Sequence, residues 1–194
     1  MDDTNSMNMN IMYIHGFGSK WKPNSDKVTA IKTLGNVTGI NISYDLPFEQ
    51  VYQKYRKHIL DHSIDLIVGT SLGGFWSGYM GNKFGIPFVS INPTINPQES
   101  LRKYQGNNTD HYGNQYNLTS SVINQYQSFP QQGAGLILLD LNDQVLNANQ
   151  TKLTLDPFFR VITFQGGDHR FQHISESIPK IKVFYRQAEV AYGF

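Results

Sequence analysis

The stretch Gly69-Thr70-Ser71-Leu72-Gly73-Gly74 constrains the fold more than any other part of this 194-residue chain. A strand-like apolar run over 64–68 precedes it, and a segment with helical periodicity follows at once. A serine between a strand and a helix takes a strained backbone conformation, and glycine on both sides avoids clashes with those two elements. Gly69 and Gly73 meet that need. The motif therefore predicts a sharp strand-to-helix turn with Ser71 at its tip; the alternative is a glycine-rich turn in which the serine only caps the helix.

Short apolar runs alternate with amphipathic stretches, the pattern of βα units around a parallel sheet. We expect strands over about 10–15, 39–45, 64–69, 86–91, 135–141 and 159–164. We expect helices from Ser25 and Asp26 to a stop at Gly35, after Pro47, from Ser71 to about Phe84, and from Phe171 past Pro179, where the proline would break or restart the helix. The length predicts one domain over residues 1–194, with residues 1–9 flexible.

Residues 105–133 do not fit this alternation. They are rich in Gln, Asn, Ser, Thr and Gly, contain three tyrosines and show no strong strand signal. A loop this long in a compact domain is usually a lid, a binding loop or a disordered stretch. We expect a short, polar, helical lid over the carboxyl edge of the sheet, with His111 as a candidate substrate contact; a passive surface excursion is the alternative.

The charge balance and the absence of certain segments exclude several classes of partner. Lys and Arg number 16 against 15 Asp and Glu, and no basic run is present, which argues against nucleic-acid binding. The apolar runs are strand-sized, whereas a membrane span needs roughly 20 residues. The polar first ten residues do not resemble a secretory signal, so we expect a cytoplasmic protein. The absence of cysteine excludes a cysteine nucleophile and thiolate metal sites. The oligomeric state stays open.

Two backbone amides near Ser71 are candidates for stabilising a developing oxyanion. The helix after the serine begins with free N–H groups at the positive end of its dipole, so the N–H of Leu72 is one candidate. A second donor is expected from the loop after the first strand, Tyr13-Ile14-His15-Gly16-Phe17-Gly18, where the N–H of Phe17 fits best and Gly16 is adjacent. The rival interpretation as a dinucleotide fingerprint fails because Trp21 stands where a third glycine is required. No cofactor is therefore expected.

An acid and a base should follow the serine in chain order, each on a loop after a strand. Asp143 lies in the turn that leaves the run 136–141, 72 positions after Ser71. Asp140 competes with it, but lies inside the apolar run, where a buried aspartate held by neighbouring amides is the simpler role. Asp156, in a turn before a proline, is a weaker rival.

The candidate base is His169, which lies in the glycine loop Gln165-Gly166-Gly167-Asp168-His169-Arg170-Phe171. An imidazole there would take the proton from the serine hydroxyl and return it to the leaving group. His173 is the nearest competitor, and its spacing from His169 could hold a metal, but no further ligands cluster nearby and no metal site is expected. His58 and His62 are assigned to the polar face of a surface helix.

With these residues placed, the chain from about 11 to 187 resembles the YqiA-like family of small bacterial esterases in the α/β-hydrolase superfamily. The stretches that carry the resemblance are Tyr13-Ile14-His15-Gly16-Phe17, the motif around Ser71, Ile91-Asn92-Pro93, the 104–119 segment, Asp143-Gln144-Val145-Leu146 and Gly166 to Phe171. The resemblance implies a minimal α/β-hydrolase fold, with a mostly parallel sheet of about six strands between helices and a short polar lid. It also implies a serine mechanism on carboxylic esters or thioesters, including acyl-CoA-like substrates, and Asp143 rather than Asp140 as the acid. Gln144, where that family has a carboxylate, and the unusually polar lid are departures.

The expected function is therefore that of a serine esterase or thioesterase whose partner is a small acyl ester or thioester. Candidate substrate contacts are His15, Gly16, Trp76, His111 and Phe171, although Trp76 fits core packing equally well. One alternative is a hydrolase-fold binding module without turnover. Another is the same triad acting on a different bond, such as an amide or an acetylated sugar.

Overall fold

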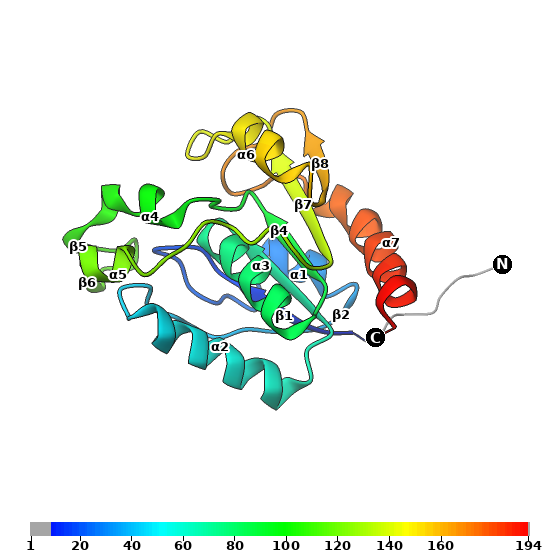
Figure 1. Ribbon diagram of the computed structural model, residues 1–194, viewed down its shortest axis with the longest axis horizontal. Coiled ribbons are helices and arrows are strands. Elements are labelled where there is room, and N and C mark those ends of the chain that lie inside the picture. The colour runs from blue at the N-terminus through cyan, green and yellow to red at the C-terminus, as the bar shows by residue number, and fades with distance from the viewer. Residues whose placement is uncertain (1–8, 194) are drawn as a thin grey trace.

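Six strands form one parallel sheet in the computed structural model, which describes residues 9–193 (Figure 1). The strand order is β2-β1-β3-β4-β7-β8, and every neighbouring pair is parallel. The strands are β1 (Met9–Ile14), β2 (Gly35–Thr38), β3 (Leu66–Thr70), β4 (Phe88–Ile91), β7 (Gly135–Asp140) and β8 (Arg160–Phe164). All carboxyl ends therefore lie along one edge of the sheet, which confirms the predicted α/β architecture.

Helices cover both faces of the sheet. Helices α1 (Asp26–Ile31) and α7 (Ile174–Tyr192) contact each other and pack on one face, whereas α2 (Phe48–His62), α3 (Leu72–Phe84) and α6 (Ala148–Leu155) pack on the other. Alternate residues of one strand serve the two layers: in β1, Ile11 packs towards α1 and α7, and Met12 towards α2 and α3. Because both faces are buried at β3, β4 and β7, these strands read as nearly continuous apolar runs.

The second strand was predicted in the wrong place. The structure has β2 at Gly35–Thr38, after the turn at 32–34 that follows α1, and residues 39–45 form an irregular segment. A Cβ on Gly35 would collide with the backbone of Met9, so this position in the strand needs a glycine. Helix α1, predicted to stop at Gly35, already ends at Ile31. The last paired residue, Thr38, is opposite Met12. Beyond Thr38 the backbone bonds to side chains instead of to the neighbouring strand: the N–H of Ile42 donates to Nε2 of His15 (3.1 Å).

Two helical predictions also need correction. Helix α7 begins at Ile174 rather than Phe171, and it continues through Pro179, which lies within its first two turns and neither breaks nor restarts it. His58 does not lie on a solvated face: its side chain is buried, and Nε2 is 2.9 Å from the Oγ1 of Thr38 at the end of β2. Helix α6, capped by Asn147, was not predicted.

The 105–133 insertion contains a β-hairpin, contrary to the prediction of a helical lid. Strands β5 (Gly106–Thr109) and β6 (Gln115–Leu118) pair antiparallel, preceded by the short helices α4 (Pro97–Ser100) and η1 (Arg102–Tyr104) and followed by α5 (Ser120–Ile123). Asp110 holds the turn by accepting hydrogen bonds from the backbone of Tyr112 (2.8 Å) and Asn114 (2.9 Å). Amide-rich strands of four residues carry little apolar alternation, so the hairpin depends on this turn and on contacts with the rest of the fold.

The predicted flexibility of residues 1–9 falls almost wholly outside the described residues, and Met9 is the first residue of β1. Within residues 9–193, no helix combines the length and the apolar character needed to cross a membrane.

Candidate active site

Ser71 forms the tip of a sharp turn between β3 and α3. Its backbone lies at φ 58° and ψ −121°, a conformation that is rare for a non-glycine residue. A Cβ on Gly69 would collide with the carbonyl of Gly73, and a Cβ on Gly73 would collide with the carbonyls of Ile14 and His15. Both glycines therefore let the strand, the turn and the β1 loop approach one another, as the motif predicted.

The structure brings Ser71, His169 and Asp143 into one chain of hydrogen bonds. Nε2 of His169 lies 3.0 Å from the Oγ of Ser71, and Nδ1 lies 2.8 Å from Oδ2 and 3.0 Å from Oδ1 of Asp143. The side chain of Asp143 is 2% exposed, and Oδ1 also accepts the N–H groups of Val145 and Leu146. This carboxylate is thus fixed by its own turn and holds the imidazole with its other ring nitrogen towards the serine.

Asp140 is engaged with a different histidine. It is fully buried, and Oδ1 lies 2.6 Å from Nδ1 of His173. Oδ2 accepts hydrogen bonds from the N–H of Asp168 (3.2 Å) and of Gln172 (2.8 Å), the backbone on either side of His169. A Cβ on Gly167 would collide with this carboxylate, so the glycine allows the loop to close over it. The geometry is that of a buried carboxylate held by amides, and it supports the loop that carries His169.

Asn92, which our interpretation of the sequence gave no role, connects the same loop to the sheet. It follows β4 at φ 41°, is 2% exposed, and accepts the N–H of Asp140 through Oδ1 (2.9 Å). Its Nδ2 donates to the carbonyls of Asp168 (3.0 Å) and His169 (3.4 Å). The sequence feature that could have identified Asn92 is a polar residue directly after a buried strand. Its partners, however, are 48 to 77 positions away in the sequence, so no local pattern pointed to them.

The loop after β1 lies beside the serine. A Cβ on Gly16 would sit 3.7 Å from the Oγ of Ser71, so this backbone borders the nucleophile. His15 is buried, with Nδ1 2.9 Å from the carbonyl of Gly16, and burial lowers its pKa below the ordinary value. The imidazole therefore stabilises the loop, and its burial keeps it out of contact with a substrate. The N–H groups of Phe17 and Leu72 stay candidates for the oxyanion donors.

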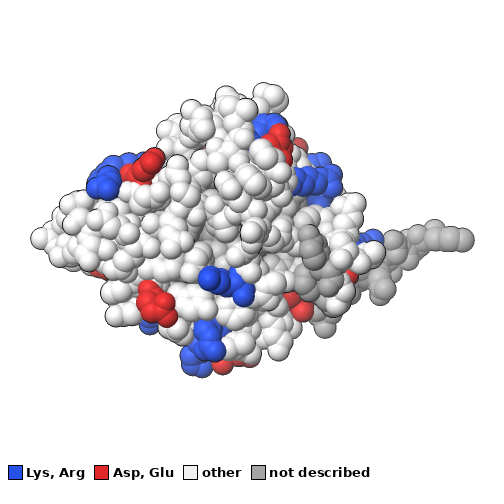
Figure 2. Space-filling view, viewed as in Figure 1, with Lys and Arg blue, Asp and Glu red and all other residues white. Residues whose placement is uncertain are grey.

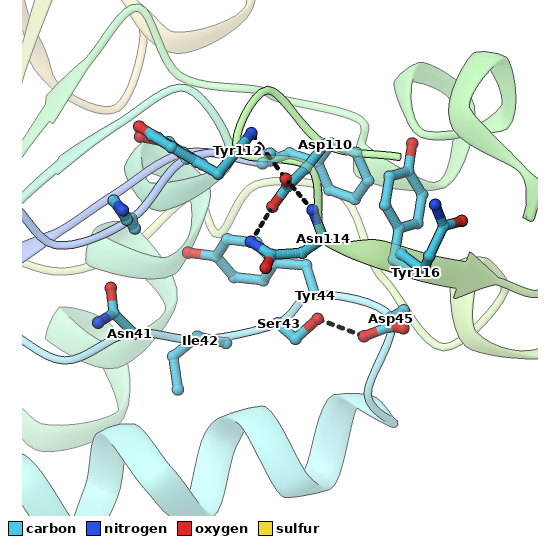
Figure 3. Close-up of a pocket in the computed structure, with 14 residues that line it drawn as sticks. Asn41, Ile42, Ser43, Tyr44, Asp45, Asp110, Tyr112, Asn114 and Tyr116 are labelled. Atoms are coloured by element: carbon cyan, nitrogen blue, oxygen red, sulfur yellow. Dashed lines mark hydrogen bonds between the residues drawn. The ribbon is translucent and has the colours of Figure 1, made fainter. Parts of the chain in front are cut away.

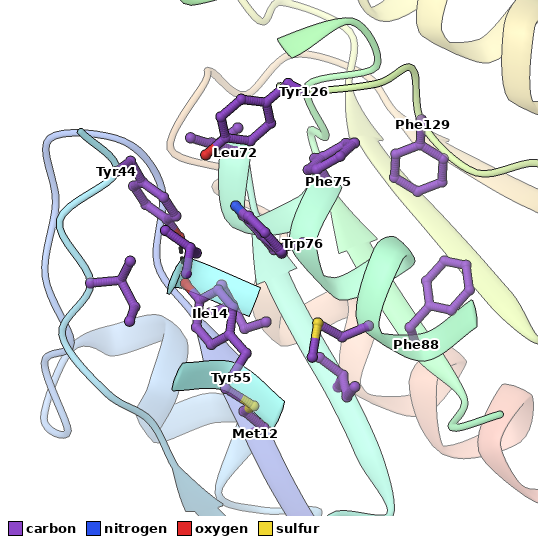
Figure 4. Packing of buried hydrophobic residues seen from close by; sticks show 14 of the residues in the cluster. Met12, Ile14, Tyr44, Tyr55, Leu72, Phe75, Trp76, Phe88, Tyr126 and Phe129 are labelled. Carbon is purple, nitrogen blue, oxygen red and sulfur yellow. Dashed lines mark hydrogen bonds between the residues drawn. The ribbon is translucent and has the colours of Figure 1, made fainter. Parts of the chain in front are cut away.

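The remaining predicted substrate contacts are either buried in the core or exposed on the hairpin. Trp76 is fully buried in the core between the sheet and α2, among Phe75, Tyr55 and Tyr126 (Figure 4). Phe171 is buried in the opposite layer, where its ring meets Phe164. His111 is exposed in the hairpin turn. Core packing accounts for Trp76 and Phe171.

Two cavities open at the carboxyl edge of the sheet. The hairpin cavity, about 360 Å³, is enclosed by residues 17–20, residues 41–45 and five hairpin residues between Asp110 and Tyr116 (Figure 3). The second, which we call the α6 cavity, is about 340 Å³ and is enclosed by residues 93–96, the end of α4 and residues from Leu146 to Thr151. Thr94 in its wall donates its N–H to the carbonyl of Ser71 (3.1 Å). Both volumes fall in the range of small-molecule sites.

Solved structures place this arrangement in the α/β-hydrolase fold class. Est1E from Butyrivibrio proteoclasticus superimposes with a TM-score of 0.68 at 14% identity, over 97% of this chain and 91% of that chain. It is also known with ferulic acid bound. The mouse α/β hydrolase domain-containing protein 10 gives a TM-score of 0.64 at 19% identity, over 92% of this chain and 90% of that chain.

The chain belongs to the Uncharacterised protein family (UPF0227), whose model matches residues 10–186. A member of this family from Vibrio parahaemolyticus is 27% identical over 180 residues, which cover 90% of this chain and 98% of that protein.

Proposed function

We propose that this protein is a serine hydrolase that cleaves carboxylic esters or thioesters of small molecules. The observation that carries the proposal is the continuous hydrogen-bonded chain from Asp143 through His169 to Ser71, at the carboxyl edge of an α/β-hydrolase sheet. The fold is shared with esterases such as Est1E, which supports the same chemistry. A cytoplasmic location and kinship with YqiA-like esterases belong to the same proposal.

The geometry suggests how the reaction would proceed. The Oγ of Ser71 attacks the ester carbonyl while Nε2 of His169 takes its proton, and Asp143 stabilises the imidazolium and fixes the ring. The N–H groups of Phe17 and Leu72 would hold the tetrahedral oxyanion. As the intermediate collapses, His169 returns the proton to the leaving oxygen or sulfur, which leaves an acyl group on Ser71. Water, deprotonated by the same histidine, then attacks the acyl group and regenerates the serine.

A fluorophosphonate probe tests this proposal directly. The native protein should be labelled covalently, and Ser71→Ala should not be labelled although it unfolds at a similar temperature. The native protein should hydrolyse p-nitrophenyl acetate and acetyl thioesters, and Ser71→Ala should hydrolyse neither. A folded native protein that neither reacts with the probe nor hydrolyses any ester would refute the proposal and favour a hydrolase-fold binding module.

A further inference from the structure

The two cavities lie on opposite sides of Ser71. In the sheet, β3 lies between β1 and β4, so the serine that follows β3 is flanked by the loops after those two strands. The hairpin cavity opens over the ends of β1 and β2, and the α6 cavity opens over the ends of β4 and β7. An ester whose carbonyl carbon reaches Ser71 therefore has a cavity available for each of its two halves.

We propose that the hairpin cavity binds a neutral, polyhydroxylated alcohol, such as a sugar ring, as the leaving half of the ester. This inference rests on the proposed function and narrows its substrate class. The acyl half then lies towards the α6 cavity, whose wall includes the apolar side chains of Pro93, Ile95 and Leu146.

Aromatic rings form the apolar part of the hairpin cavity. The ring of Phe17 stacks on Tyr104 (4.8 Å between centroids) and meets Tyr116 edge to face (5.4 Å), so it is held in place. Tyr112 is 37% exposed at the rim, and the ammonium group of Lys20 lies over its ring, 4.2 Å from the centroid. A sugar ring has an apolar face of C–H groups that packs on such rings, and a rigid aromatic wall loses little conformational entropy when it binds.

Amide side chains form the polar part of the cavity, and each is oriented by one hydrogen bond, made either by its oxygen or by its NH₂ group. Asn41 accepts the N–H of Trp21 through Oδ1 (2.7 Å), Asn114 donates through Nδ2 to Asp110 (2.9 Å), and Gln115 donates through Nε2 to Thr109 (2.7 Å). Among the described residues, the other end of each amide has no hydrogen-bond partner. One NH₂ donor and two carbonyl acceptors among the lining residues are therefore available for hydrogen bonds to a ligand, and hydroxyl groups, which both donate and accept, match that mixture.

The charges of the cavity argue for a neutral ligand. Its wall contains one cation, Lys20, and two carboxylates, Asp45 and Asp110. Both carboxylates already accept hydrogen bonds from the protein, as Figure 3 shows for Asp110. Sites for phosphate-bearing groups rely on arginine and clustered cations, and no arginine lines this cavity within the part of the chain that the structure describes. Figure 2 shows acidic and basic side chains interspersed on one face of the molecule.

Matched acetate esters test the proposal. The substrates are methyl glucoside acetylated at its primary hydroxyl, cyclohexylmethyl acetate as a hydroxyl-free analogue, and an acetylated glycerol phosphate as an anionic analogue. We expect kcat/KM to be at least about tenfold higher for the sugar ester than for either analogue, because amides left unpaired penalise a ligand without hydroxyls.

Variants assign the preference to the cavity. Asn41→Leu should lower kcat/KM for the sugar ester about tenfold and for cyclohexylmethyl acetate much less, because that ester offers the amide no hydroxyl; Tyr112→Ala removes part of the apolar wall and should lower kcat/KM for both esters. Asn107→Leu is the matched control, because Asn107 is exposed on the same hairpin and does not line the cavity. Circular dichroism melting checks that each variant folds, and two independent variants guard against a loss through misfolding.

The outcomes separate the two proposals. The cavity proposal is wrong if the native protein hydrolyses p-nitrophenyl acetate but does not prefer the sugar ester, or if Asn41→Leu keeps that preference. In either case the serine hydrolase proposal stands. Faster turnover of the phosphate ester would overturn the neutral assignment. If no ester is cleaved and the probe does not label Ser71, both proposals fail together.

Discussion

The carboxylates of Asp140 and Asp143, three residues apart at the end of β7, face different histidines. Asp143 pairs with His169 (2.8 Å), whose other nitrogen reaches Ser71, and Asp140 pairs with His173 (2.6 Å). Asp143 is therefore hydrogen-bonded through His169 to the nucleophile, whereas Asp140 stabilises the loop that carries His169.

This division predicts different effects for two similar substitutions. Asp143→Asn should lower kcat about 10³- to 10⁴-fold, since the amide favours the wrong tautomer of His169. Asp140→Asn keeps one carbonyl oxygen for the amides of Asp168 and Gln172, so kcat should fall less than about tenfold. Steady-state hydrolysis of p-nitrophenyl acetate measures both. The reverse order would show that Asp140 is the acid.

Asn92 should act as a positioning residue for His169. Glycine tolerates the left-handed backbone at this site, so Asn92→Gly removes the side chain without adding backbone strain. Without its hydrogen bonds the His169 loop should shift, and kcat should fall by up to about 100-fold while KM for a simple ester stays constant. The rate of fluorophosphonate labelling should fall in parallel. Unchanged kcat in a folded Asn92→Gly variant would contradict this role.

His58 should make the protein less stable in acid. Burial, together with the neighbouring His62, lowers the pKa of His58 to about 4, below the ordinary value of 6.5. Between these values the unfolded chain binds the extra proton, so stability is fully present above about pH 6.5 and is lost as the pH falls towards 4. We expect this contribution to be on the order of 1–3 kcal/mol.

Urea unfolding of the native protein and His58→Gln, from pH 7 to pH 4, measures that loss. The variant keeps a hydrogen-bonding group near Thr38 and should show a flatter dependence on pH. The exposed His62 provides the control, because His62→Gln should leave most of the slope in place. Equal slopes for the native protein and His58→Gln would contradict the assignment.

Trp76 should affect stability rather than substrate choice. It is fully buried, and its ring stacks on Phe48 (4.4 Å between centroids). Trp76→Ala should cost about 3–5 kcal/mol of unfolding free energy. Leu153→Ala, on the surface of α6 at 73% exposure, should change it by less than about 0.5 kcal/mol. In the milder variant Trp76→Phe, the ratio of kcat/KM between short and long acyl esters should not change; an altered ratio would place Trp76 at the acyl site.

The sequence alone determined the order of the main elements and the residues that meet at the serine. Apolar runs and helical periods are local properties, and parallel strands bring all their carboxyl ends to one edge, so Ser71, Asp143 and His169 could be predicted as neighbours although 98 positions separate the first from the last. The glycines around Ser71 were informative because a Cβ at Gly69 or Gly73 collides with backbone.

Only the tertiary structure decided which polar groups are buried and what they bind. The partners of Asp140, Asn92 and His58 are distant in sequence, so no local pattern identified them. The β5–β6 hairpin was missed for a related reason: its residues have weak strand preferences, and it is held by the Asp110 turn and by the bond from the N–H of Asn117 to Asp45. Irregular segments and polar contacts depend on what the rest of the chain brings to them, whereas buried strands and amphipathic helices are encoded by their own periodicity.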